Sequence, residues 1–275
     1  MESKCDCKPV RWAGFKGYTS SHFALWMDAW NLLTGASSSG IICLFVLAGG
    51  VAAGKPGGGN SPFPGKEDVV LILEILEVGP FMSNCYLVAC PRTKDCIIID
   101  PGSDGPVIIR KAKELSLKVK YIINTHAHID HIGANSDVCR AFDAPLLGHK
   151  ADLPLFRGRS SSMSLFTDAG ELKEPDRFVQ EGEILELGEL QVKILETPGH
   201  SPGGISLEVG GVLFSGDTLF ASSIGRTDLP GGSYNGLIRS IQKKLLVYPD
   251  DTEVFPGHGP PTTIGYERRH NPFLT

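Results

Sequence analysis

The sequence predicts one globular domain of mixed α/β class that follows an N-terminal extension. Short β-rich segments outnumber helical ones, and some of them are joined as hairpins, as in the stretch Glu208-Val-Gly-Gly-Val212. Their order differs from a regular βαβ repeat, which favours mixed layering of helices on sheets. With 275 residues, of which 41% are hydrophobic, the chain is long enough for one large domain with a tail.

The expected elements begin after residue 68. Alternating or continuous apolar residues predict the strands, and apolar residues at helical spacing predict the helices. The predicted strands are 69–76, 86–89, 97–99, 119–123, 191–195, 205–209, 212–214 and 253–255. The predicted helices are 106–115, with Asp104 near its start, 133–142 and 237–246.

Residues 1–66 differ in composition from the rest, and we expect the main domain to span residues 67–275. All three tryptophans lie in the first thirty residues, and a Gly- and Pro-rich stretch at 55–65 is typical of a linker. The apolar run 41–53 has 13 residues, fewer than the roughly 20 of a membrane span, so no stable span is expected. The extension is interpreted as an organelle transit segment, a membrane-facing hydrophobic hairpin or a poorly ordered tail. We therefore expect an intracellular protein, in a plastid or mitochondrion or in the cytoplasm.

The net charge and the cysteine content indicate which partners and which cellular compartment to expect. The formal net charge is −5, and the basic residues are scattered, which disfavours a nucleic-acid partner. The seven cysteines are an odd number without a CxxC pair, so we expect reduced thiols in an intracellular compartment. Cys96 and Cys139 lie in apolar or helical patterns and are predicted to be small buried hydrophobic residues.

The stretch Thr125-His-Ala-His-Ile-Asp-His131 is the most informative motif of the chain. It places His126, His128, Asp130 and His131 within six residues, although the whole chain has only eight histidines. Packing a core does not require such a density, whereas imidazole and carboxylate are the ligands that zinc and iron prefer. The isolated His22, His149 and His270 are interpreted as surface or satisfied residues.

Three further ligand candidates follow predicted strands. His200, Asp217 and His258 each come a few residues after a strand end, in a turn that contains Gly or Pro. Loops at strand ends are where α/β proteins build their sites, and Gly lets backbone approach a crowded centre.

Seven ligands are too many for one tetrahedral metal ion, but they are enough for two metal ions. In an extended segment His126 and His128 point the same way, so both can hold one ion, which His200 would complete. Asp130 and His131 follow where the chain turns, and with His258 they would hold the second ion. Asp217, with two oxygens, would bridge the pair and leave room for a shared water, which becomes a hydroxide near neutral pH. We expect zinc first, with iron and manganese as alternatives.

These seven residues resemble the ligand set of the metallo-β-lactamase superfamily. The resemblance covers about residues 69–275 and implies a four-layer αβ/βα sandwich, with two sheets face to face, helices outside and a dinuclear site along the sheet edge. Asp217 stands where the β-lactamases carry cysteine or serine. The segment Gly225-Arg-Thr-Asp-Leu-Pro-Gly-Gly-Ser233 is similar to one in the glyoxalase II group, the hydroxyacylglutathione hydrolases.

The resemblance therefore implies hydrolysis of a small-molecule thiolester such as S-lactoylglutathione. A metal-bridging hydroxide would attack the carbonyl, a metal would polarise its oxygen, and Asp130 would orient the hydroxide as well as bind metal. The chain runs only 17 residues past His258 and has Gly259-Pro-Pro261 where family members tend to carry a tyrosine. It resembles the short, single-domain branch of the group, which leaves recognition of glutathione open.

Two alternatives share the predicted fold. A persulfide dioxygenase would use one iron held by His126, His200 and Asp217, a two-His-one-carboxylate set. A lactonase or other ester hydrolase would use the same dinuclear site with a different pocket. A nuclease is disfavoured by the net charge. The sequence leaves the oligomeric state open.

Overall fold

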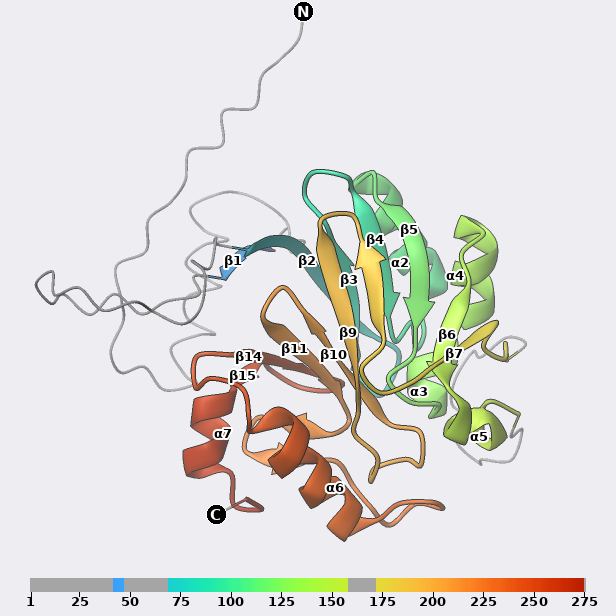
Figure 1. The fold of residues 1–275 in the computed structure, drawn as a ribbon. Helices are drawn as coiled ribbons and strands as arrows, with labels where there is room; N and C mark the ends of the chain where they lie inside the picture. The colour runs from blue at the N-terminus through green and yellow to red at the C-terminus, as the bar shows by residue number, and fades with distance from the viewer. Residues whose placement is uncertain (1–41, 47–68, 158–171, 275) are drawn as a thin grey trace, which may run out of the picture. The chain divides into compact units, whose positions relative to one another are not determined.

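The computed structural model describes residues 42–46, 69–157 and 172–274 (Figure 1). The chain divides into two units, residues 1–40 and 41–275, and all the described residues belong to the second. The predicted transit segment and the linker at 55–65 lie outside the described residues. No helix in the described part of the chain is long and apolar enough to cross a bilayer.

Two main sheets form the described part of the second unit. The first sheet has the order β1-β2-β3-β4-β5-β6-β7, and the second has the order β15-β14-β11-β10-β9-β8. The strands of the first sheet are β1 (Ile42–Val46), β2 (Val69–Val78), β3 (Ser83–Ala89), β4 (Asp95–Ile99), β5 (Lys118–Ile123), β6 (Leu146–His149) and β7 (Arg177–Val179). Those of the second are β8 (Ile184–Leu187), β9 (Leu190–Glu196), β10 (Ile205–Val209), β11 (Val212–Gly216), β14 (Glu253–Pro256) and β15 (Thr262–Thr263), and β12 (Leu219–Phe220) pairs with β13 (Ser223–Ile224).

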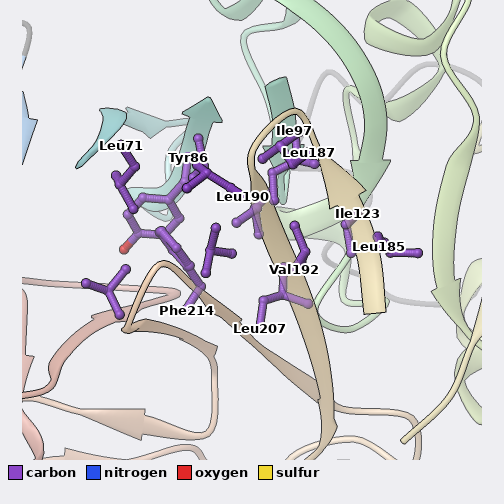
Figure 2. Packing of buried hydrophobic residues seen from close by; sticks show 14 of the residues in the cluster. Leu71, Tyr86, Ile97, Ile123, Leu185, Leu187, Leu190, Val192, Leu207 and Phe214 are labelled. Atoms are coloured by element: carbon purple, nitrogen blue, oxygen red, sulfur yellow. The ribbon is translucent and has the colours of Figure 1, made fainter. Parts of the chain in front are cut away.

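The two sheets pack face to face because both contribute apolar side chains to one core. Figure 2 shows this interface, where Tyr86 and Ile97 of the first sheet meet residues such as Val192 and Phe214 of the second. The rings of Tyr86 and Phe214 are 5.1 Å apart in an edge-to-face arrangement.

Helices cover the outer faces of both sheets. The outer face of the first sheet packs against α2 (Gly105–Glu114) and α4 (Asn135–Phe142), through residues such as Ile108 and Val138. The outer face of the second packs against α6 (Tyr234–Ser240), the π-helical turn η3 (Ile241–Leu245) and α7 (Ile264–His270). The predicted four-layer αβ/βα sandwich is thus the observed architecture (Figure 1). Because β3 is buried on both faces, its residues from Cys85 to Ala89 are apolar without alternation.

Several elements differ from those expected. The predicted helix 237–246 is α6 followed by the π-helical turn η3, and the predicted helix 133–142 begins only at Asn135. Asp104 precedes α2 in a left-handed conformation and does not cap it, because its carboxylate accepts a 2.8 Å hydrogen bond from the Gly79 N–H instead. Strand β1 lies at the edge of the first sheet and pairs antiparallel with β2, within the segment expected to be an extension.

Candidate metal centre

The seven predicted ligands meet where strands of both sheets end. In the second sheet β9, β11 and β14 run in the same direction, because β10 is antiparallel to both β9 and β11 and β14 is parallel to β11. Their carboxyl ends therefore share one edge, and His200, Asp217 and His258 follow these ends. From the first sheet, His126 and His128 follow β5, and Asp130 and His131 lie in the short helix α3 (Ile129–Ile132). The structure brings all seven residues together.

One cluster consists of His126, His128 and His200, whose ligand atoms lie within 4.8 Å of one another. His128 Nδ1 lies 2.8 Å from His200 Nε2. The ring centroids of His126 and His128 are 4.8 Å apart, as expected for neighbours on one side of an extended segment.

The second cluster consists of Asp130, His131 and His258, again with ligand atoms within 4.8 Å. His258 Nε2 lies 3.2 Å from Asp130 Oδ2 and 3.2 Å from His131 Nε2. Asp217 lies between the clusters, with Oδ2 3.4 Å from His200 Nε2 and Oδ1 3.5 Å from His131 Nε2. The donor set therefore divides into two triads with one carboxylate shared by both.

In four of the histidines, a hydrogen bond at Nδ1 fixes the orientation of the ring and leaves Nε2 facing the centre; three of them bond directly to an acceptor, and His126 bonds through Thr125. The Nδ1–H groups of His200 and His258 donate to the carbonyl oxygens of Arg226 and Phe81, at 2.8 and 3.1 Å. His131 Nδ1 is 3.0 Å from Asp100 Oδ2, an oxygen that can only accept from it. Because each Nδ1 carries the proton, each Nε2 presents a lone pair to the centre, as metal-binding histidines do.

His126 is held in the same way through a relay. The Thr125 hydroxyl donates to Asp100 Oδ2 at 2.6 Å, so its oxygen is left to accept from His126 Nδ1 at 3.1 Å. His126 Nε2 then points a lone pair into the centre. Within the described residues this nitrogen and Asp217 Oδ1 are buried and have no hydrogen-bond partner. Orphaned buried acceptors and facing lone pairs are costly alone and are satisfied by a cation, so this donor set fits two divalent metal ions.

The surroundings of His126 and His128 favour their neutral forms, whereas those of His131 favour a positive charge. Burial, reinforced by the other histidines, lowers the pKa of His126 well below its usual value, and burial lowers the pKa of His128 to about 4. Burial alone would lower the pKa of His131, but the carboxylates of Asp217 and Asp100 raise it to about 10. The negative potential that would hold a proton on His131 also favours a metal ion in its place.

The triads differ in solvent access. The side chains of His126, His131 and His200 are buried, whereas His128, Asp130, Asp217 and His258 are partly exposed. A substrate can therefore approach the centre over these four residues.

The family model of the metallo-β-lactamase superfamily matches residues 78–258, which contain every ligand described above. The chain belongs to the metallo-β-lactamase superfamily. Members of this superfamily bind divalent metal ions, and the family suggests a metal-dependent enzyme of hydrolase type.

Individual members of the superfamily resemble the chain over most of their length. The hydroxyacylglutathione hydrolase GloC of Haemophilus influenzae is 42% identical over 207 residues, which are 74% of this chain and 97% of that protein. The crystal structure of the B3 metallo-β-lactamase BLEG-1 has a TM-score of 0.69 and 38% identity, and covers 74% of this chain and 99% of that one. That of TTHA1623 in a di-iron-bound form has a TM-score of 0.67 and 37% identity, and covers 73% and 99%.

The sequence analysis missed three residues that hold the candidate ligands in place: Asp100, Asn84 and Asp152. Asp100, at the end of β4, accepts from Thr125 and His131, and the Asn84 side chain donates to the carbonyls of Pro256 and Gly259 at 2.9 Å on either side of His258. Asp152 is the third. The signal for Asp100 was available, because this carboxylate ends an apolar strand and is followed by Pro-Gly. Asn84 and Asp152 stand in no comparable pattern.

Glycine is required beside Asp217. A Cβ on Gly257 would lie 2.2 Å from Asp217 Oδ1 and 2.9 Å from His131 Cε1, and one on Gly225 would lie 1.9 Å from the Asp217 carbonyl oxygen. The predicted segment 225–233 thus begins against the backbone carbonyl of Asp217, and these two glycines let the loops pack closely around that residue.

Proposed function

We propose that the chain hydrolyses a small-molecule thiolester, of which S-lactoylglutathione is an example, at two divalent metal ions, zinc by preference. The observation that carries the proposal is the pair of complete ligand triads joined by Asp217. His126, His128 and His200 would hold one ion, and Asp130, His131 and His258 the other. When bound, two such ions supply Lewis acidity for a carbonyl oxygen and lower the pKa of a water molecule toward neutrality.

The residues of the chain contribute orientation and charge. Burial alone would raise the pKa of Asp130, but His258 and His131 beside it hold that pKa well below its usual value, so its carboxylate is ionised at neutral pH. It is partly exposed, and it would accept a hydrogen bond from the attacking water and orient it toward the substrate. Asp217 would hold the two halves of the site at a fixed separation. A thiolate is a good leaving group, so the reaction requires no separate general acid.

Two observations support a thiolester over a β-lactam. The ligand between the two triads is the carboxylate of Asp217, and the glyoxalase II-like segment begins at Gly225 beside the backbone carbonyl of Asp217. The same segment supplies the Arg226 carbonyl that orients His200. The likeness to the Haemophilus influenzae hydroxyacylglutathione hydrolase supports the same substrate class.

A mononuclear iron dioxygenase acting on a persulfide is the second candidate. It is favoured by a two-His-one-carboxylate set within the centre, in which Asp217 Oδ2 lies 3.4 Å from His200 Nε2 and 4.0 Å from His126 Nε2. This candidate leaves the triad of Asp130, His131 and His258 without a role, which is why we place it second.

The test combines elemental analysis of the purified full chain with a substrate panel. S-Lactoylglutathione, a lactone, a β-lactam and glutathione persulfide are compared, with thiol release and oxygen uptake as readouts. Two metal ions per chain and thiolester turnover that stops on chelation are expected. One iron per chain with oxygen uptake would establish the dioxygenase instead, and preferential lactone or β-lactam turnover would refute the thiolester assignment.

A further inference from the structure

Asp152 is a fully buried carboxylate outside the seven predicted ligands. It ends the short 3₁₀ helix η1 (Lys150–Asp152), directly before α5 (Leu153–Arg157). Its Oδ2 accepts from the Ala127 N–H at 3.1 Å and from the Ser201 hydroxyl at 2.7 Å, and its Oδ1 accepts from the Gly203 N–H at 2.6 Å. All three of these donors are neutral.

These partners belong to the two loops that carry one of the triads. Ala127 lies between His126 and His128, and Ser201 directly follows His200. The loops come from different sheets, and Asp152 is 25 residues from Ala127 and 49 from Ser201. One carboxylate therefore fixes the backbone on both sides of the triad at once.

The contact is closely built. A Cβ on Gly203 would lie 2.7 Å from the Asp152 backbone nitrogen and 2.9 Å from its Cγ and Oδ1. Only glycine lets the loop after His200 approach this closely, and Oδ1 then receives a short hydrogen bond from the same residue.

The other triad is held by different residues. Asp100 orients His131, the Ser83 hydroxyl donates to the Asp130 carbonyl at 2.6 Å, and Asn84 holds the loop around His258. None of these contacts involves Asp152. Asp100 also reaches His126 through the Thr125 hydroxyl and so serves both triads, whereas within the described residues Asp152 supports only the loops of His126, His128 and His200.

We propose that Asp152 is a positioning residue that sets the metal affinity of the triad His126, His128 and His200 without acting on the other triad. The proposal rests on the two-ion centre of the proposed function. Carboxylate groups behind metal ligands contribute about 10- to 100-fold to metal affinity. Asp152 would act in this way through backbone and hydroxyl groups, because it holds the loops and does not contact an imidazole.

Asp152→Asn is a nearly isosteric change that weakens this support. A side-chain amide has one oxygen and one NH₂ group, and each carboxylate oxygen of Asp152 accepts from at least one donor. Whichever way the amide is turned, its NH₂ faces a backbone N–H, and the loops must separate.

Glu267→Gln is the matched control. Glu267 is also fully buried, and its carboxylate accepts from the Ser222 N–H, the Thr262 hydroxyl and the Asn271 amide at 2.9, 2.6 and 2.7 Å. It lies in α7 and supports the β12–β13 region, so the substitution perturbs a comparable network away from the histidine loops. Ser201→Ala, which removes one of the three donors to Asp152, is a milder second variant.

The experiment titrates metal-free full-length protein with Co²⁺, followed by visible absorption and calorimetry. His128→Ala and His258→Ala identify the binding step that belongs to each triad, and circular dichroism with thermal unfolding reports the fold of every variant. We expect Asp152→Asn to weaken the step missing in His128→Ala by about 10- to 100-fold and to leave the other step unchanged. Ser201→Ala should weaken the same step by about threefold to tenfold, and Glu267→Gln neither step.

Two-step binding with wild-type affinities in Asp152→Asn and Ser201→Ala would overturn the proposal, as would equal weakening of both steps. If Glu267→Gln weakened metal binding as much as Asp152→Asn does, the effect of Asp152 would be one of general stability, and the proposal would also be overturned. If the wild-type chain takes up a single ion, the two-ion centre of the proposed function is refuted. In that case His128→Ala first shows whether the single ion binds at the triad of His126, His128 and His200. If it does, Asp152→Asn must lower the affinity for that ion, and an unchanged affinity overturns the role of Asp152.

Discussion

Gly257 offers a test of how closely Asp217 must be placed. It precedes His258, and its φ lies outside the left-handed region, so alanine at this position has no backbone penalty of its own. The added Cβ would lie 2.2 Å from Asp217 Oδ1, whereas Cβ contacts under 3.0 Å are essentially never found. Gly257→Ala must therefore move the carboxylate or the loop by at least about 0.8 Å.

The size of the effect follows from this displacement. A misplacement of about 1 Å at a reacting centre can reduce the rate about 100-fold, which is about 2.7 kcal/mol of activation free energy. We expect Gly257→Ala to lower kcat/KM for S-lactoylglutathione by about 10- to 100-fold. The assay is thiol release by the metal-loaded enzyme, with metal content measured on the same samples.

Gly259→Ala is the control for this substitution. Gly259 has φ +73°, so alanine is strained there, but a Cβ would meet no atom within 4 Å. It should lower the stability by about 1 kcal/mol and leave turnover by the folded protein within about threefold of wild type. If Gly257→Ala retained wild-type kcat/KM at full metal content, the argument that Asp217 holds the two halves in register would be refuted.

Three further predictions follow from the same structure. His128→Ala should remove one metal ion and reduce thiolester hydrolysis at least 100-fold while circular dichroism stays unchanged; turnover by metal-stripped wild-type enzyme would contradict the mechanism. Burial raises the pKa of Glu253, so the protonated form stabilises the fold at acidic pH and this stability is lost as pH rises through the raised pKa. Glu253→Gln should therefore raise the melting temperature at pH 7 more than at pH 4, and an equal shift at both would contradict this origin. Deleting residues 1–40 or 1–66 should leave kcat/KM within about twofold, but the longer deletion also removes β1 and should lower the melting temperature by a few degrees; a large loss of turnover would mean that the extension supports the site.

The sequence predicted the fold class because its signals are local. Long apolar or alternating runs marked β2, β9 and β10 within a few residues of their ends. The four-residue strands β6 and β8 were not predicted, because such short segments have no resolvable period. The π-helical turn η3 was also unforeseen, since its residues keep a helical pattern.

The seven candidate ligands, and the grouping of six of them into two triads that the structure brings together, could be named from the sequence alone. His200, Asp217 and His258 each follow a strand end in a turn, and the other four stand close together within residues 126–131, so residue type and short-range spacing are enough to single them out. The supports behind them were decided only by the tertiary structure. Asn84 is 172 residues from Pro256, and Asp152 is 49 residues from Ser201. Such contacts exist only once the two sheets have packed, because no local pattern records which distant backbone groups a buried side chain will satisfy.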